Sequence, residues 1–293
     1  MIAIMMLAAS VCTAAQTHSA EDTPMMFVNV TALTRGDRVA ANLKPEDFTL
    51  LENGSPQPVR YFSHGDEPVS LVVVYDATSS MPARIREGQA VLAELIRTSH
   101  PEDDLGLILT QDKAQVAVAL GGSRSDIEKE AGTIHAGGFR ALWDGMFLGI
   151  SQLQHARYQR KAMVVISDGG DETSRHTPAE LRKLLQQAGV EVYGIGTFNP
   201  YAGRLTARTN SLRLDELLTT TGGRAISAYN EDNFAWAAAR ISHELHTQYV
   251  LGYYPAHENR DSKDCKLEVR PSASASSAKL HLHYGTGYCP AAS

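Results

Sequence analysis

From Ser70 onward, apolar runs of strand length alternate along the chain with segments that have a helical pattern. The strand-like runs cover 70–75, 105–110, 162–167 and 190–196, and the helical patterns cover 82–98, 143–154, 178–188 and 231–247. Strands that alternate with helices favour a parallel sheet covered on both faces, because a parallel crossover needs a long connection that is usually a helix. The pattern therefore predicts an α/β domain with a doubly wound, mostly parallel sheet over residues 69–247.

The segments on either side of this region are typical of β structure. Residues 26–68 contain alternating apolar and polar positions, and Glu52-Asn-Gly-Ser55 is a strong hairpin turn. Residues 248–293 contain the run Tyr249–Pro255 and two further alternating stretches. The two ends of a compact domain often lie close together. We therefore expect an N-terminal β module and a C-terminal β segment that pair into one small sandwich.

The N-terminus carries an uncharged apolar run from residue 2 to residue 15. Such a run is too short to span a bilayer comfortably and is typical of a signal-peptide core. We therefore interpret residues 1–16 as a signal peptide and expect an exported protein, periplasmic or secreted. Cys265 and Cys289 would remain after cleavage. An even pair in an exported chain favours a disulfide, and two free buried thiols are the alternative.

Several function classes lack the residues that they need. The net charge is −6, and no lysine and arginine stripe with interleaved aromatics is present, so we expect no nucleic-acid partner. The chain has no Gly-x-Ser-x-Gly elbow and no phosphate-binding loop, and separated Ser, His and Asp residues alone do not indicate a catalytic triad. We expect no enzymatic activity, no small-molecule substrate and no stable membrane span.

Oxygen-bearing side chains follow the first buried strand at alternate positions. Asp76 ends the run Leu71–Tyr75, and Thr78 and Ser80 come next. A carboxylate and two hydroxyls on a tight loop can supply part of the oxygen shell that Mg²⁺ prefers. The carboxyl ends of parallel strands are also where α/β sheets usually place ligands. The loop is therefore a candidate metal site.

Three separated motifs resemble those of von Willebrand factor A domains. Asp76-Ala-Thr-Ser-Ser-Met81 resembles their Asp-x-Ser-x-Ser loop, Ala162–Gly170 resembles their fourth strand, and Gly137-Gly-Phe-Arg-Ala-Leu-Trp-Asp144 resembles the segment between them. The flanking segments resemble those of a bacterial branch of VWFA-related proteins that is common in Acidobacteria. The resemblance covers roughly residues 26–290, and the motifs appear in the family's order.

The resemblance implies a metal-ion-dependent adhesion site that holds Mg²⁺ or Mn²⁺. Carried over by position, the first loop supplies Asp76, Thr78 and Ser80, and the third loop supplies Asp168. The second loop of the family supplies a threonine immediately before Ala-Leu-Trp-Asp, and in this chain that position is Arg140. This is the main departure from the family's pattern.

Arg140 leaves two hypotheses open for the site. Arginine has no lone pair to offer and stays protonated, and two unit charges about 4 Å apart repel by roughly 4 kcal/mol at an effective dielectric constant near 20. A divalent ion would double that repulsion. Arg140 therefore either neutralises Asp76 and Asp168 in place of the metal, or swings outward and contacts an acidic ligand beside a bound ion.

Both hypotheses predict non-enzymatic recognition of, or adhesion to, a partner protein that presents an exposed Asp or Glu. The alternative is a structural or scaffold protein of the cell envelope with a degenerate, metal-free site. Two neighbouring features are interpreted as structural. Asp171 and Glu172 are typical of a solvated loop, and Asp144 is expected to cap or orient the helix that begins near Trp143.

Overall fold

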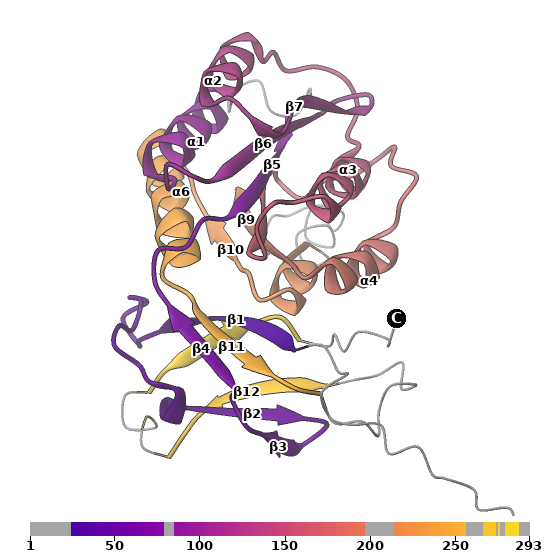
Figure 1. Ribbon diagram of the computed structural model, residues 1–293. Helices are drawn as coiled ribbons and strands as arrows, with labels where there is room; N and C mark the ends of the chain where they lie inside the picture. Colours follow the sequence, from indigo (N-terminus) through magenta and orange to yellow (C-terminus); the bar gives the residue numbers. More distant parts are fainter. Residues whose placement is uncertain are drawn as a thin grey trace, which may run out of the picture.

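The computed structural model describes residues 25–78, 85–196, 214–255, 266–273, 275 and 279–286. The expected signal peptide, Ser80, Cys265 and Cys289 lie outside these residues. The described chain forms an α/β unit and, next to it, a smaller unit of β strands (Figure 1). The fold class predicted from the sequence is confirmed, with additional antiparallel sheets formed by the terminal strands.

The α/β unit is built on a six-stranded sheet in the order β10-β9-β8-β5-β6-β7. All neighbouring pairs are parallel except β6 and β7, which are antiparallel. The strands are β5 (Ser70–Asp76), β6 (Asp104–Thr110), β7 (Ala114–Gly122), β8 (Lys161–Ile166), β9 (Val190–Gly196) and β10 (Ala225–Ser227). The central strand β5 is buried along its whole length, which explains its continuous apolar sequence.

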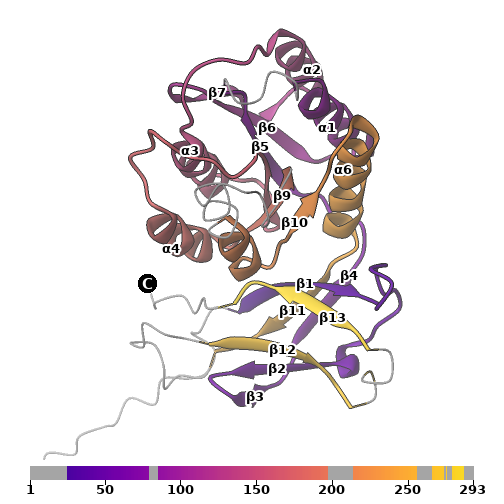
Figure 2. The ribbon, with the colours of Figure 1, turned by 180° about the vertical axis from the view of Figure 1, so that it is seen from behind.

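Helices cover both faces of this sheet (Figures 1 and 2). Leu71, Val73 and Tyr75 pack with α1 and α6 on one face, whereas Val72 and Val74 pack with α3 and α4 on the other. The helices are α1 (Ile85–Thr98), α2 (Arg124–Thr133), α3 (Leu142–Gln154), α4 (Pro178–Ala188) and α6 (Glu231–His246), with a further helical stretch over 214–220.

Helix α4 begins and ends where its sequence predicts. The Thr177 hydroxyl accepts the N–H of Glu180, and the Glu180 carboxylate accepts the N–H of Thr177, so the two form a capping box with Pro178 in the first turn. The helix ends at Gly189, which adopts φ 63°. Glycine adopts this left-handed conformation with little strain.

The smaller unit is a sandwich in which both sheets combine strands from the two ends of the chain. One sheet has the order β13-β1-β11-β4, and the other has the order β12-β2-β3. The strands are β1 (Met26–Leu33), β2 (Phe48–Glu52), β3 (Ser55–Gln57), β4 (Tyr61–His64), β11 (Tyr249–Tyr253), β12 (Leu267–Pro271) and β13 (His281–Tyr284). Val30, Leu50 and Leu251 belong to one shared core between the sheets.

The chain enters and leaves the α/β unit through two adjacent connections. His64 at the end of β4 pairs with Tyr249 at the start of β11, in antiparallel register. This pairing places the sandwich at the amino ends of the parallel strands, as Figure 1 shows. The opposite, carboxyl edge of the sheet is therefore the end remote from the sandwich.

Among the described helices, none combines the length and the apolar composition that crossing a bilayer requires.

Candidate functional site

Asp76 is fully buried at the carboxyl end of β5. Its Oδ1 accepts the N–H of Thr78 at 3.2 Å, and its Oδ2 accepts the hydroxyl of Ser167 at 2.7 Å. Burial raises the pKa of Asp76, the nearby Asp168 raises it further, and the bonds from Ser167 and Thr78 oppose this shift. The hydroxyl of Ser167 was not singled out by the sequence, because the family motif points to the next residue.

Asp168 follows β8 on the adjacent loop and is held by the backbone of that loop. Its Oδ1 accepts the N–H of Gly170 at 2.9 Å, and the N–H of Gly169 donates to the hydroxyl of Ser167 at 3.0 Å. Gly169 adopts φ 82°, which lets the chain turn sharply here. The loop therefore presents the Asp168 carboxylate at the carboxyl edge of the sheet.

Arg140 makes an ion pair with Asp168. Its Nη2 lies 3.2 Å from Oδ2 of Asp168, and its side chain is 23% exposed. The carbonyl of Arg140 accepts the N–H groups of Glu172 and Thr173, both at 2.9 Å, and the Thr173 hydroxyl at 3.1 Å. The backbone of Arg140 is thus fixed to the third loop while its guanidinium reaches the surface.

The structure brings Asp76, Thr78, Arg140 and Asp168 to one edge of the sheet, whereas Ser80 lies outside the described residues. Within the described part of the chain, no group of three or more His, Cys, Asp or Glu residues is arranged to hold a metal ion. The guanidinium of Arg140 pairs with the Asp168 carboxylate and also lies against Gly170. With Arg140 in this position, the described residues do not fit a divalent ion.

Phe139 is an exposed aromatic residue beside this ion pair. The residue is 64% exposed, and its N–H donates to Oδ1 of Asp112 at 2.8 Å. Gly138 adopts φ 76° and lies against Asp112, so the loop is anchored by that carboxylate. Our sequence analysis did not select Phe139. The signal that could have found it is an aromatic residue directly after a Gly-Gly turn, next to the family's second-loop position.

Asp171 is not the solvated side chain that the sequence suggested. Its Oδ1 accepts the hydroxyl of Ser174 at 2.5 Å and the N–H of Trp143 at 3.3 Å. Burial raises its pKa, although these hydrogen bonds oppose the shift. The interpretation is wrong for Asp171, which ties the third loop to the start of α3. The neighbouring Glu172 is exposed.

Asp144 anchors the same loop from the first turn of α3. Its Oδ1 accepts the N–H groups of Arg175 at 2.9 Å and His176 at 3.1 Å, and it lies 2.8 Å from Nδ1 of His176. Burial opposes ionisation, but the bonds from His176 and Arg175 hold the pKa of Asp144 below its usual value. Asp144 therefore positions the loop rather than capping its own helix.

A family model described as von Willebrand factor type A domain matches residues 70–241. The chain belongs to this family. The match covers the whole six-stranded sheet and the helices around it as far as residue 241 within α6, and leaves the sandwich outside. That the residues gathered at the carboxyl edge stand at the family's metal-site positions, with Arg140 in place of the threonine, stays a prediction from the sequence. Membership of the Acidobacteria-type branch and the division of the chain into domains stay predictions.

One curated relative is an uncharacterised protein of Borreliella burgdorferi, which is 24% identical over 202 residues. The match covers 61% of this chain and 59% of that protein. The chain therefore matches little more than half the length of this relative.

Solved structures share the fold at low sequence identity. A von Willebrand factor type A protein from Catenulispora acidiphila is 14% identical with a TM-score of 0.50, and the match covers 84% of this chain and 74% of that chain. An aerotolerance-related membrane protein from Bacteroides fragilis is 16% identical with a TM-score of 0.50, covering 61% of this chain and 98% of that chain. Likeness at this level concerns the fold alone.

Proposed function

We propose that this protein is an exported, non-enzymatic recognition module, periplasmic or secreted, that binds an acidic side chain of a partner protein. The binding face lies at the carboxyl ends of the parallel strands of the α/β unit, which we call the A domain. Arg140 is the group that contacts the partner's Asp or Glu. In this proposal the guanidinium takes the place of the divalent ion of the family, so that recognition does not require Mg²⁺ or Mn²⁺.

The ion pair between Arg140 and Asp168 carries the proposal. A guanidinium is a planar fork with donors on more than one edge, and it binds carboxylates with charge-assisted hydrogen bonds. One edge of Arg140 contacts Asp168 at 3.2 Å. A partner carboxylate that reaches the exposed part of the same guanidinium would form a further contact, with Asp168 holding the fork in place.

Phe139 supports a protein partner rather than a free ion. A large aromatic side chain that is mostly exposed beside an arginine provides apolar contact area next to a charged anchor, and aromatic residues and arginine are enriched at the centres of protein interfaces. The chain's family is also one whose members mediate protein–protein interactions. Both observations favour recognition or adhesion over catalysis.

The expected result of removing the guanidinium is loss of binding to acidic peptides. On an array of peptides that carry Asp or Glu beside apolar residues, Arg140→Gln should bind about 10- to 100-fold more weakly than the wild type, because a hydrogen bond to a charged group contributes about 1.5–3 kcal/mol. Folding should change little, since partly exposed ion pairs contribute about 1 kcal/mol or less. Fluorescence anisotropy of the best peptide measures both affinities.

The matched control is Arg97→Gln, which removes an exposed guanidinium on α1 that pairs with Glu94. This variant should bind the peptides as the wild type does. Equal binding by wild type, Arg140→Gln and the control would contradict the proposal. That outcome would favour a scaffold protein of the cell envelope whose site is degenerate.

The proposal also predicts how the site responds to metal. Isothermal titration of the wild type with Mg²⁺ or Mn²⁺ should give no heat of binding, whereas Arg140→Thr should bind the ion, because the repulsive charge is gone and a hydroxyl oxygen is added. Adding Asp76→Ala to Arg140→Thr should abolish the gain. Heat of binding in the wild type that disappears in Asp76→Ala would show a metal site despite Arg140.

A further inference from the structure

A pocket of about 470 Å³ lies between the sandwich and the amino end of the A domain. Its walls come from β1 and β4 on one side, and from the start of β8 and the end of α4 on the other. We call it the junction pocket. Its volume falls within the range of small-ligand sites, and it lies at the opposite end of the sheet from Arg140.

The junction pocket is lined by a buried arginine with unmet hydrogen-bonding groups. Arg160 is 4% exposed, and its Nη1 donates to the carbonyl of Gly65 at 3.1 Å. Its Nε and Nη2 have no hydrogen-bond partner among the described residues. Buried donors without partners are rare and costly. Burial lowers the pKa of Arg160, with the nearby Glu67 carboxylate opposing the shift.

Glu67 is an incomplete counter-ion for this guanidinium. Its Oε2 lies 3.5 Å from Nε of Arg160, so the two side chains form an ion pair, but no hydrogen bond joins these atoms, and the Glu67 side chain is 49% exposed. Lys161 lines the same pocket and adds a second positive charge. Glu67 alone does not satisfy the two positive side chains of the pocket, so a further carboxylate could bind there.

The mouth of the junction pocket is apolar and aromatic. Phe27 and Tyr61 lie edge to face, with ring centroids 5.5 Å apart and an interplanar angle of 88°, and both side chains are exposed. Gly252 lies between them in the sheet, and its missing side chain leaves the space that the two rings occupy. The pocket thus joins an apolar rim to a cationic wall.

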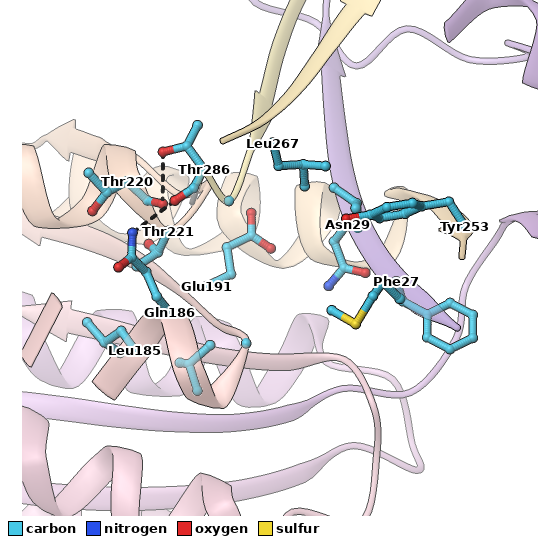
Figure 3. A pocket seen from close by; sticks show the side chains of 15 residues that line it. Phe27, Asn29, Leu185, Gln186, Glu191, Thr220, Thr221, Tyr253, Leu267 and Thr286 are labelled. Atoms are coloured by element: carbon cyan, nitrogen blue, oxygen red, sulfur yellow. Dashed lines mark hydrogen bonds between the residues drawn. The ribbon is translucent and has the colours of Figure 1, made fainter. Parts of the chain in front are cut away.

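A smaller cavity shares Met26, Phe27, Asn29 and Gly189 with the junction pocket. Figure 3 shows the side chain of Glu191 between those of Thr221 and Asn29 in this cavity. Its volume is about 100 Å³, room for only about three waters. Both carboxyl oxygens of Glu191 are already hydrogen-bonded. The smaller cavity is therefore not the ligand site.

We propose that the junction pocket binds an organic carboxylate that carries an apolar group. The carboxylate would replace Glu67 as the partner of Arg160, with Lys161 adding attraction, and the apolar group would lie against Phe27 and Tyr61. The inference does not depend on the acidic-epitope function of Arg140. Two sources supply this chemistry: a free small acid, and the C-terminal residue of a polypeptide.

The test uses the full-length protein with N-acetylphenylalanine as probe and N-acetylphenylalaninamide as its neutral counterpart. Titration calorimetry should detect the acid, with the amide bound at least about 10-fold more weakly, because a charge-assisted hydrogen bond contributes about 1.5–3 kcal/mol. Equal binding of acid and amide, or binding of neither, would overturn the proposal.

Two variants separate ligand binding from a structural role of Arg160. Glu67→Gln removes the competing carboxylate, and we expect it to bind the acid more tightly than the wild type does. Lys161→Gln should bind it more weakly. If Arg160 only fastens the connection at Gly65, Glu67→Gln would leave binding unchanged, and that result would contradict the proposal. Arg97→Gln is the control for a change of net charge.

A third comparison identifies the source of the carboxylate. The peptide acetyl-Gly-Gly-Gly-Phe with a free C-terminus presents the same terminal group on a chain. Binding as tight as that of N-acetylphenylalanine assigns the pocket to a polypeptide C-terminus, whereas binding at least about 10-fold weaker assigns it to a free acid. Phe27→Ala should weaken the binding of both ligands by about 10-fold or more, because the apolar group loses the aromatic surface that it would bury. Unchanged binding in that variant would rule out the apolar contact.

Discussion

Replacing Glu191 by glutamine should make the stability of the protein much less dependent on pH between about 4.5 and 7. Burial raises the pKa of Glu191 from 4.5 to about 7, although Gln248 and Tyr193 donate hydrogen bonds to it. One pKa unit corresponds to about 1.4 kcal/mol, so the group contributes about 3 kcal/mol to the pH dependence.

The direction of this pH dependence follows from which state, folded or unfolded, holds the Glu191 proton more tightly. The folded protein keeps the Glu191 proton up to about pH 7, whereas the unfolded chain releases it near pH 4.5. The contribution of this group to stability is therefore fully present below pH 4.5 and is lost as the pH rises to 7 and above. Glutamine does not titrate in this range, so Glu191→Gln should not lose this stability as the pH rises.

Urea denaturation of both proteins at several pH values between 4 and 8 measures the effect. The free energy of unfolding of the wild type relative to Glu191→Gln should fall by about 3 kcal/mol across this range. Glu128→Gln, at an exposed position on α2, is the control, and its free energy of unfolding should change with pH as that of the wild type does. Parallel curves for Glu191→Gln would show that the buried carboxyl titrates as it does in the unfolded chain.

The buried parallel strands could be predicted from sequence because both of their faces are apolar. β5, β8 and β9 are rich in apolar residues, although Glu191 interrupts the run of β9, and the limits of all three strands agree with the predicted ranges within a residue or so. β7 and α2 were not predicted. β7 is an antiparallel edge strand whose side chains are mostly not buried, and α2 buries only Ile127 and Ala131. Neither carries a strong periodic signal.

The sequence predicted which loops form the candidate site, but not the hydrogen bonds that join them. The motifs placed Asp76, Thr78 and Asp168 together, and the charge of Arg140 suggested that it would pair with a carboxylate. The hydrogen bond from Ser167 to Asp76 joins residues that are 91 positions apart. Such long-range pairs depend on how strands align in the sheet, and no local pattern specifies them.

The contacts between the two units were beyond sequence reasoning for the same reason. Gln248 donates to both Glu191 and Thr31, so it joins the A domain to β1 of the sandwich at the point where the chain leaves α6. Arg224 pairs with Asp37, a residue 187 positions away. These polar residues have ordinary local surroundings, and only the folded chain brings them together.

Removing the guanidinium of Arg224 should destabilise the protein by up to about 3 kcal/mol. Glu244 has a 1% exposed side chain, and its Oε1 lies 2.5 Å from Nη2 of Arg224 and 2.6 Å from Nε of Arg240. Breaking a buried ion pair from one side costs about 3–5 kcal/mol, because a buried charge loses its partner. Arg240 lessens this cost in Arg224→Met without removing it.

The control has the same substitution in an exposed pair. Arg182 lies 2.8 Å from Glu216, and the two side chains are 35% and 59% exposed, far more than that of Glu244. Arg182→Met should change the free energy of unfolding by less than about 1 kcal/mol, since exposed ion pairs contribute little. Urea denaturation compares the two variants, and equal destabilisation would mean that burial of Glu244 does not matter.

A second substitution tests whether the lost partner, rather than lost packing, causes the effect. Adding Glu244→Leu to Arg224→Met removes the carboxylate that has lost one of its two arginine partners and should recover part of the stability, because apolar residues often replace buried ion pairs without loss. The difference between the double variant and the sum of the single variants measures the coupling. Arg224 and Arg240 both also pair with Asp37 of the sandwich, so the two arginines that neutralise Glu244 also join the sandwich to the α/β unit.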